Sequence, residues 1–482
     1  MQTTVLIVLP LAAALAVWLV PWRGTAAGAF AVLVALAELA YWIGMAASNF
    51  DFRSGELQRG LDVVWVDDLD IAYKVGLFDF SVWLVGLTSL VTAAAIAYGF
   101  WAGRERPRAY FGLLLFLEGA TVGVFAAQDL LLFYVFFEAM LIPLYVLVGV
   151  WGGAGRIGAT IKLIIYTLAG SLLMLVAIIV LGLQQGTFDM TQLGKAGSTW
   201  VYLGFLAAFA VKAPIWPFHG WLPDAYREAP AEVSALLSGV ISKTAAYGFL
   251  RIALPTFPGP AADLRWLVLT AAAVALVYGS LLAFRAPDVR GVIAYSSLAQ
   301  MGLIFIGLMA FNDSGLNGAL LQMVNHGLIS ASLFLLAGTI ERRTSTGRLE
   351  LLGGMARGRP VLATMLITVG VIALAVPFST AFAGEFLILN GVFARGWGWA
   401  VVGAVAIVLA AMYMLRLISA VLHEDVGTVV PAEALDLRPA ETSMVGALVA
   451  VLVVLSFWPA AITDHAFGGK PTVSVTGQFQ GR

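Results

Sequence analysis

Five ionisable residues lie near the middle of long apolar stretches of the sequence, where charged side chains are rare. They are Glu118, Glu138, Lys212, Lys243 and Glu385. If these stretches cross a bilayer, each charge costs at least roughly 2.5 to 3.5 kcal/mol by insertion scales, and the five together on the order of 12 kcal/mol. That sum is comparable to the stability of a whole domain. Amines and carboxylates whose charge depends on their neighbours are suited to passing protons, so we interpret the set as a proton path.

Two histidines extend this set, and each candidate also has a structural interpretation. His219 and His326 titrate near neutral pH, but each histidine is also able simply to bond a backbone carbonyl. Glu138 and Lys212 are alternatively a static ion pair that holds two helices together, although such pairs are often no better for stability than apolar residues. Lys243 is alternatively a lysine satisfied within the scaffold, and Glu118 has a structural alternative as well.

The composition places the chain in a membrane. Hydrophobic residues make up 61% and charged residues 11%, with a mean hydropathy of +0.94. This balance leaves too little polar surface to solvate a 482-residue globule. A net charge of −1 without a basic stripe disfavours a nucleic-acid partner. With no cysteine and four scattered histidines, we expect no disulfide, metal site or redox cofactor in this chain.

Apolar stretches of about 18 to 25 residues, long enough to cross a hydrocarbon core, predict fourteen transmembrane helices and an all-α polytopic fold. The expected spans are 4–21, 27–46, 78–101, 109–127, 129–150, 159–183, 200–222, 231–253, 264–284, 289–310, 316–340, 361–390, 399–422 and 442–463. Alternating ten-residue strands, which a barrel would need, are not evident.

The loops predict an orientation. Most loop lysines and arginines follow odd-numbered spans, as in RERPR (104–108) and ERRTSTGR (341–348). Because such residues concentrate on the cytoplasmic side, both termini are expected outside. The acidic segment 51–77 is then the one long outer loop, and it forms either a hairpin or an interfacial piece.

Two spans contain helix breakers at corresponding places. Pro214 and Pro217 interrupt span seven, and AVPFSTAFAGE (375–385) interrupts span twelve. Unwound backbone is tolerated deep in a membrane where it lines a polar cavity, so paired breaks point to an ion site. The breaks lie five spans apart, which suggests two repeats of opposite topology.

Several segments resemble the antiporter-like subunits of respiratory complex I, among them most closely the subunit M (chain 4) family, over roughly residues 75 to 425. They are FYVFFEAMLIPLYVLVGVWGG (133–153), YTLAGSLLML (166–175), KAPIWPFHGWLPDAYREAPAEVSALLSGVISKTAAYGFLRIALP (212–255) and AYSSLAQMG (294–302). The resemblance implies inverted five-helix repeats at spans four to eight and nine to thirteen. The corresponding units are 1–108, 109–253, 264–422 and 423–482.

The resemblance also implies residue roles. The family's fifth-helix glutamate falls on Glu138, its broken-helix lysine on Lys212 and its central lysine on Lys243. The charged residue of its second broken helix falls on Glu385, where subunit M carries glutamate and the related antiporter subunits generally carry lysine. One departure is Glu232, because many subunit M chains have a small or hydroxyl residue there.

The resemblance therefore implies a proton-translocating subunit of a respiratory NADH:quinone oxidoreductase in a bacterial plasma membrane. FMN and iron–sulfur clusters are expected in other subunits, and two homologous antiporter-like subunits among the partners. The alternatives are a subunit of a sodium/proton antiporter, a subunit of an energy-converting hydrogenase, or an inert scaffold for lipid and partner subunits.

Overall fold

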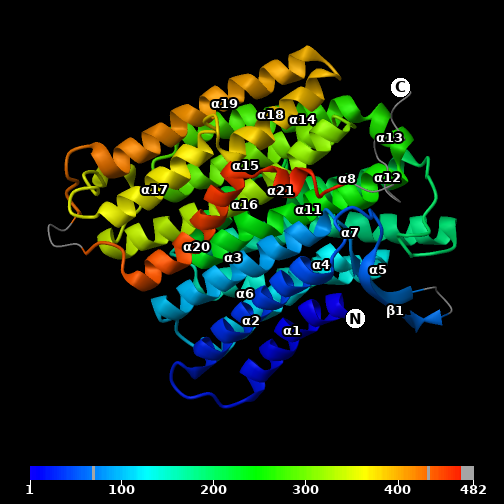
Figure 1. The fold of residues 1–482 in the computed structure, drawn as a ribbon, viewed down its shortest axis with the longest axis horizontal. Helices are drawn as coiled ribbons and strands as arrows, with labels where there is room; N and C mark the ends of the chain where they lie inside the picture. Colours follow the sequence, from blue (N-terminus) through cyan, green and yellow to red (C-terminus); the bar gives the residue numbers. More distant parts are fainter. Residues whose placement is uncertain (68–70, 431–434, 468–482) are drawn as a thin grey trace.

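A computed structural model describes residues 1–67, 71–430 and 435–467 as a bundle of long helices (Figure 1). Within these ranges, 12 helices or helix runs are long and apolar enough to cross a membrane. They are α1 (Gln2–Leu19), α2 (Ala26–Asn49), α3 (Ser81–Ala102), α4 (Pro107–Ala126), α5 (Leu130–Ala139) with α6 (Leu141–Trp151), α7 (Arg156–Gln185), the 231–256 span, α14 (Arg265–Arg285), α15 (Val289–Leu308), α16 (Asp313–Thr344), α19 (Trp397–Ile418) with η5 (Ser419–His423), and α20 (Pro439–Phe457).

The 231–256 span changes its winding several times along its length. It consists of α10 (Ala231–Leu236), η2 (Leu237–Ile241), α11 (Ser242–Gly248), η3 (Phe249–Ala253) and α12 (Leu254–Thr256), where η2 and η3 are π-helical. π-helical turns within α-helices are rare and occur frequently at functional sites.

Two further spans are broken, as the prolines predict. The first consists of α8 (Thr199–Lys212) and the short α9 (Leu222–Glu228), separated by non-helical residues that include Pro214 and Pro217. The second consists of α17 (Pro360–Ala373) and α18 (Thr380–Phe393), with Pro377 between them. Proline lacks the amide hydrogen that continues a helix, and at the first break other donors replace it. The Ile215 amide donates to the Ala210 carbonyl oxygen at 2.8 Å, and the Trp221 indole donates to the Val211 carbonyl oxygen at 2.9 Å. Both predicted interruptions are confirmed, while the count of fourteen spans and the inverted repeats stay predictions.

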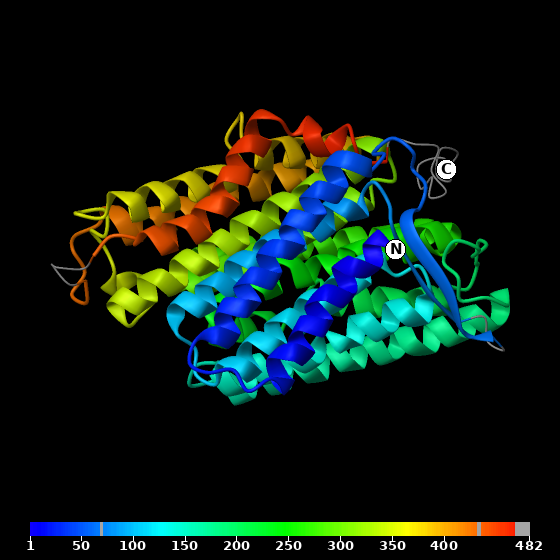
Figure 2. The ribbon, with the colours of Figure 1, turned by 60° about the horizontal axis from the view of Figure 1, so that its bottom comes forward.

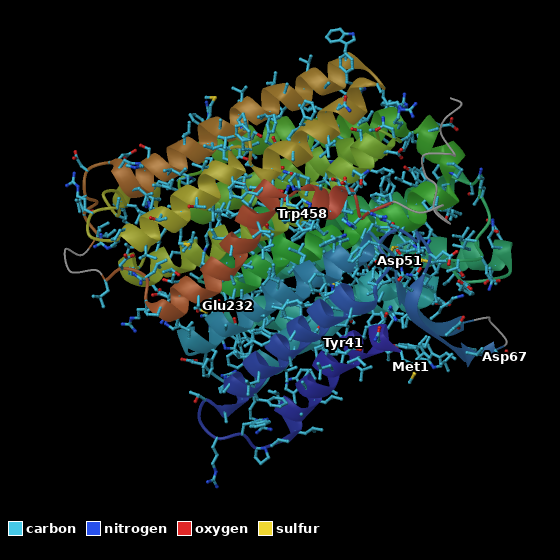
Figure 3. All side chains as sticks on the ribbon, in the orientation of Figure 1. Met1, Tyr41, Asp51, Asp67, Glu232 and Trp458 are labelled. Atoms are coloured by element: carbon cyan, nitrogen blue, oxygen red, sulfur yellow. The ribbon has the colours of Figure 1, made fainter. Side chains whose placement is uncertain are left out.

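The helices run between two ends of the bundle. One end, here called the hairpin end, carries Met1, the strands β1 (Gln58–Val66) and β2 (Ile71–Leu77), and the short α13 (Pro258–Asp263) (Figures 1 and 3). The two strands pair antiparallel, so the hairpin alternative for the acidic outer loop is confirmed. The opposite end, here called the arginine-rich end, carries the loops after α3, α6 and α14 and the short η4 (Leu349–Leu351).

An ion pair fastens the hairpin to a second loop. Lys74 of β2 donates to Asp189 Oδ2 at 2.6 Å and lies 3.3 Å from Asp62 Oδ2. Burial opposes the charged form of Lys74, but Asp189 and Asp62 outweigh it and raise the pKa of the lysine. Burial likewise opposes the charge of Asp189, but hydrogen bonds from Lys74 and Thr191 lower the pKa of that carboxyl.

The core lies along α16 and the 231–256 span, in both of which the most apolar window is entirely buried. The outer helices are only partly covered: α7, for example, exposes Ile161, Ile165, Val176 and Leu183. Figure 2 shows α1 and α2 side by side along one face of the bundle. Exposed aliphatic side chains on the outer helices are what lipid surroundings require.

Candidate functional site

Lys212 lies at the last turn of α8, directly before the first break. Its side chain is buried, its Nζ donates to the carbonyl oxygen of Phe137 at 3.0 Å, and the same Nζ lies 4.0 Å from the centroid of the Phe137 ring. Phe137 belongs to the last turn of α5. The lysine is therefore held by a backbone dipole and an aromatic face.

Glu138 follows Phe137 and does not form the static ion pair of the structural alternative. Among the described residues, no carboxylate oxygen lies within 4.0 Å of Lys212 Nζ, and the buried Oε1 of Glu138 has no hydrogen-bond partner. The two residues are nevertheless neighbours, because the lysine contacts the residue that precedes the glutamate. The Glu138 carboxylate and the Lys212 ammonium group therefore interact electrostatically without forming a direct ion pair.

Lys243 and His326 form the centre of the site. Lys243 is fully buried on α11, and its Nζ lies 2.8 Å from His326 Nδ1 and 3.3 Å from Ser242 Oγ, and also donates to the carbonyl oxygen of Ser238. The Ser238 hydroxyl lies 2.9 Å from the Ser297 hydroxyl of α15. No acid within 4.0 Å pairs with this lysine among the residues described.

Two glycines bring Lys243 and His326 together. A Cβ atom built on Gly327 of α16 would lie 2.6 Å from the Gly239 carbonyl oxygen, and one on Gly239 would lie 3.1 Å from the Gly327 carbonyl oxygen. Here the two backbones touch without intervening side chains. Gly327 follows His326 directly, and Gly239 precedes Lys243 by one helical turn, so this contact sets the distance between the two side chains.

A polar route continues from His326 to Glu385. A cavity of about 20 Å³ is lined by His326, Gln300, Gln322 and Tyr413, and this volume is roughly enough for one water molecule. Gln322 Nε2 donates to Gln300 Oε1 at 2.7 Å, and Gln300 Nε2 donates to Glu385 Oε1 at 3.1 Å. Glu385 is buried on α18, in the second turn after the break. The structure therefore brings Lys243, His326 and Glu385 into one connected polar region.

The other predicted histidine lies apart from this region. His219, in the first break, packs its ring against Tyr278 of α14 with 5.5 Å between ring centroids, and its buried Nδ1 has no hydrogen-bond partner in the described chain. Among the described residues, no hydrogen bond or ion pair links His219 to Lys212 or Lys243. Phe137, which contacts Lys212, stacks on Phe133, and the Phe133 ring lies beside Gly248 of α11. The membership of His219 in the proton path stays a prediction.

Glu118 has a partner that the sequence analysis missed. Glu38 of α2 is 0% exposed, Glu118 of α4 is 1% exposed, and the two carboxyl groups are close enough to interact. Within the described chain, none of their four oxygens has a hydrogen-bond partner of normal geometry. The sequence already marked Glu38 as a candidate, because it is the single charged residue in the apolar run AAGAFAVLVALAELAYWIGMAASN.

Glu232 has its partners at the arginine-rich end. Arg104 donates from Nε and Nη2 to the two carboxylate oxygens at 2.7 Å each, and the Tyr110 hydroxyl donates to Oε1 at 2.7 Å. Burial opposes the charge of Arg104, but the carboxylate outweighs it and raises the pKa of the guanidinium. Glu232 thus joins the start of the 231–256 span to Arg104 and to Tyr110 of α4.

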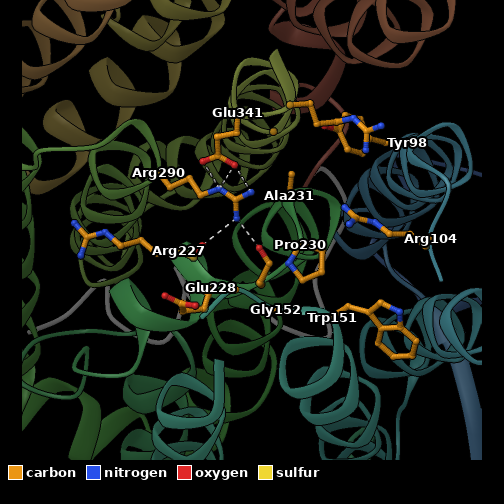
Figure 4. A pocket seen from close by; sticks show the side chains of 14 residues that line it. Tyr98, Arg104, Trp151, Gly152, Arg227, Glu228, Pro230, Ala231, Arg290 and Glu341 are labelled. Atoms are coloured by element: carbon orange, nitrogen blue, oxygen red, sulfur yellow. Dashed lines mark hydrogen bonds and ion pairs between the residues drawn. The ribbon is translucent and has the colours of Figure 1, made fainter. Parts of the chain in front are cut away.

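A pocket of about 370 Å³ opens beside this ion pair (Figure 4). Arg290 crosses it, bonding Glu341 at 2.6 Å and the carbonyl oxygens of Arg227 and Ala229. Ala231, the first residue of the 231–256 span, is also part of the lining. The pocket at the arginine-rich end therefore extends to the start of the span that carries Lys243.

The family comparison matches residues 127–410 to the family described as "NADH:quinone oxidoreductase/Mrp antiporter, TM". NADH-quinone oxidoreductase subunit M of Rhodobacter capsulatus is 36% identical over 435 residues, 86% of this chain and 84% of the relative. Subunit M of Rickettsia prowazekii is 34% identical over 423 residues, covering 86% of both chains. NAD(P)H-quinone oxidoreductase chain 4 2 of Thermosynechococcus vestitus is 34% identical over 98% of this chain and 93% of its own.

Solved structures agree with these matches. A chain of respiratory complex I from Thermus thermophilus superposes with a TM-score of 0.89 at 28% identity, covering 99% of this chain and 100% of that one. A chain of the Mrp complex from Dietzia superposes with a TM-score of 0.87 at 22% identity, covering 99% and 97%. The second likeness concerns the fold alone.

Proposed function

The chain belongs to the NADH:quinone oxidoreductase/Mrp antiporter transmembrane family, and we propose that it is a proton-translocating membrane-arm subunit of a respiratory NADH:quinone oxidoreductase. The observation that carries this proposal is the connected polar region from Lys243 through His326 and the water-sized cavity to Glu385. Such a region is costly inside a membrane bundle unless it serves ions or protons. The bacterial relatives support a place in the plasma membrane.

Protons enter, in this proposal, at the arginine-rich end. The 370 Å³ pocket reaches Ala231, and Lys243 lies about 18 Å further along the same span at 1.5 Å per residue. The hydroxyls of Ser238 and Ser297 lie between them. Lys243 passes a proton to His326, and water in the cavity carries it to Glu385, which releases it toward the other side of the membrane.

In this proposal, Glu138 controls how tightly Lys212 holds its proton. Because no direct ion pair locks them, the carboxylate is free to move closer to the lysine or away from it, and each position changes how tightly Lys212 holds its proton. Lysine suits this position because its charge responds to burial, whereas arginine stays charged. Moving one charge across the membrane takes about 2.3 kcal/mol per 100 mV, and that energy comes from redox chemistry elsewhere in the complex.

The redox groups of the complex, FMN and iron–sulfur clusters, belong in this proposal to other subunits, and two homologous antiporter-like subunits are the expected neighbours. The chain itself contributes proton binding and transfer. Glu118, with Glu38, adds a buried acid pair beside the main route.

The competing assignments are a subunit of a sodium/proton antiporter or of an energy-converting hydrogenase. The relatives named as subunit M are 33–36% identical, and among the solved structures the complex I chain is 28% identical against 22% for the Mrp chain. Both comparisons favour the oxidoreductase. Sodium-dependent proton exchange in vesicles that do not oxidise NADH would instead identify the antiporter.

The test uses the purified native complex reconstituted in vesicles, with NADH oxidation and proton export measured together. We expect Lys243→Ala to assemble normally and to lower the number of protons exported per NADH. Unchanged export from an assembled complex that carries Lys212→Ala, Lys243→Ala and Glu385→Ala together would instead identify an inert scaffold.

A further inference from the structure

Arg251 is a buried cation that the proton route does not use. It lies in η3, two helical turns beyond Lys243 toward the hairpin end, and is 4% exposed. Its Nε and Nη2 donate to Gln128 Oε1 at 3.2 and 2.8 Å, and its guanidinium lies 5.0 Å from the centroid of the Phe78 ring. Among the described residues, no acidic side chain lies within 4.0 Å of it. A buried charge normally has an oppositely charged partner, and here the direct partners are neutral.

Arg251 lines a pocket of about 410 Å³ at the hairpin end. Lys74 and Lys195 also line this pocket, and none of the described lining residues is acidic. Apolar side chains, including Leu57, Phe78 and Met190, form the rest of the wall. The cavity thus combines positive charge with an apolar surface at the end of the membrane bundle.

Two of the three cations are left without an acidic partner. Lys74 is neutralised by Asp189 and Asp62. Asp189 also accepts hydrogen bonds from the backbone and hydroxyl of Thr191 and from the Gln192 amide, so its oxygens are already engaged. Lys195 is exposed and forms no ion pair with any described residue. Lys74 with Asp189 and Asp62 carries one excess negative charge, so Arg251 and Lys195 leave these five residues with a net charge of +1.

We propose that this pocket binds the phosphate group of an anionic phospholipid, with Arg251 as the buried ligand and Lys195 as the ligand at the rim. Guanidinium and ammonium groups form strong charge-assisted hydrogen bonds with phosphate oxygens. The apolar wall favours a phospholipid over free phosphate, because the glycerol and acyl carbons cover Leu57 and Met190. This inference does not depend on the proton route.

The test measures lipid binding to the detergent-purified native complex after delipidation. Phosphatidylglycerol, zwitterionic phosphatidylcholine and inorganic phosphate are added separately. Mass spectrometry measures the retained lipid, and thermal unfolding measures the stability of the complex. We expect the wild type to bind phosphatidylglycerol at least about ten-fold more tightly than either other probe, and Arg251→Gln to lose about ten-fold, the equivalent of one charge-assisted contact.

Two further variants keep the test decisive. Lys195→Gln changes an exposed side chain, so it should fold normally and still weaken phosphatidylglycerol binding. Arg416→Gln is the matched control, because Arg416 bonds the carbonyl oxygens of Phe284 and Ala286 far from this pocket and should leave lipid binding unchanged. Equal binding of phosphatidylcholine, or equal binding of inorganic phosphate, would overturn the lipid assignment. The lipid assignment would also be overturned if Lys195→Gln bound phosphatidylglycerol as tightly as the wild type does. It would be overturned as well if a side chain of another subunit contacted Arg251 in the complex.

Discussion

Lys243 Nζ lies 2.8 Å from His326 Nδ1, and this contact joins the 231–256 span to α16. His326 Nδ1 faces the lysine, while Nε2 has no protein partner in the described chain, and the residue lines the water-sized cavity. A histidine in this position is able to accept a proton on one nitrogen and release another from the second.

The first prediction concerns that contact. His326→Gln keeps a hydrogen-bonding side chain but removes the titratable imidazole, so we expect protons exported per NADH to fall while the complex assembles. Lys243→Arg should have the same effect, because arginine does not release its proton. Both variants are measured in reconstituted vesicles. Wild-type stoichiometry in His326→Gln would exclude the histidine from the route.

A second prediction separates charge from shape at Glu138. Glu138→Gln should cripple export because the side chain no longer influences Lys212 by charge, whereas Glu138→Asp should keep part of it. Lys212→Ala should remove export from an assembled complex. If the Gln and Asp variants pump equally well, the carboxylate charge has no role.

A third prediction concerns the glycine contact. Gly327→Ala places a Cβ atom 2.6 Å from the Gly239 carbonyl oxygen, so we expect a destabilisation of about 1–3 kcal/mol in thermal unfolding, together with reduced export. The matched control is Gly44→Ala in α2, where nothing lies within 4 Å of the added carbon. That variant should be neutral or more stable by roughly 0.5–1 kcal/mol, because alanine favours helix. Equal stability of the two variants would contradict the close approach.

A fourth prediction tests the acid pair. Two buried carboxyl groups that lie this close together are costly to ionise at the same time, so we expect them to act as a pair. We expect Glu38→Gln, Glu118→Gln and the double variant to affect export to the same degree, without loss of assembly. Additive effects of the two single variants would show that the acids act independently.

A fifth prediction follows from the ion pair of the hairpin end. The pKa of Asp189 is lowered, so its contribution to stability is complete above its ordinary pKa of 3.8 and is lost as the pH falls through the lowered value. The pKa of Lys74 is raised, so its contribution is complete below 10.5 and is lost as the pH rises through the raised value. Proteolysis of the hairpin should therefore increase at both extremes of pH.

Two variants complete this experiment: Asp189→Asn tests the ion pair, and Glu350→Gln at the opposite end of the bundle is the control. Asp189→Asn should make the hairpin susceptible already at pH 7, with little further change in acid. Glu350→Gln removes an exposed ion pair with Arg348 at the arginine-rich end and should leave hairpin proteolysis unchanged. A hairpin in Asp189→Asn that is as resistant as the wild type would show that the ion pair does not fasten it.

The helices, the two breaks and most of the buried charges were predictable from the sequence, because long apolar runs, prolines and isolated charges are local signals. Glu38 carried the same signal as Glu118 and was overlooked. Gln300 and Gln322 were not predictable, since amides are common in helices and their importance depends on lying between His326 and Glu385 in space. The separation of Glu138 from Lys212 was hidden as well, because a sequence indicates that two charges are near each other but not their side-chain conformations.

The glycine contact between Gly239 and Gly327 also constrains how the protein moves. Many transporters work by rocking one half of the molecule against the other around a central site. Here the segments 109–253 and 264–422 meet backbone against backbone, and any large rotation would pull Lys243 away from His326. A transport mechanism that preserves this contact relies on side-chain rotations and rearranging water instead of on rocking one segment against the other.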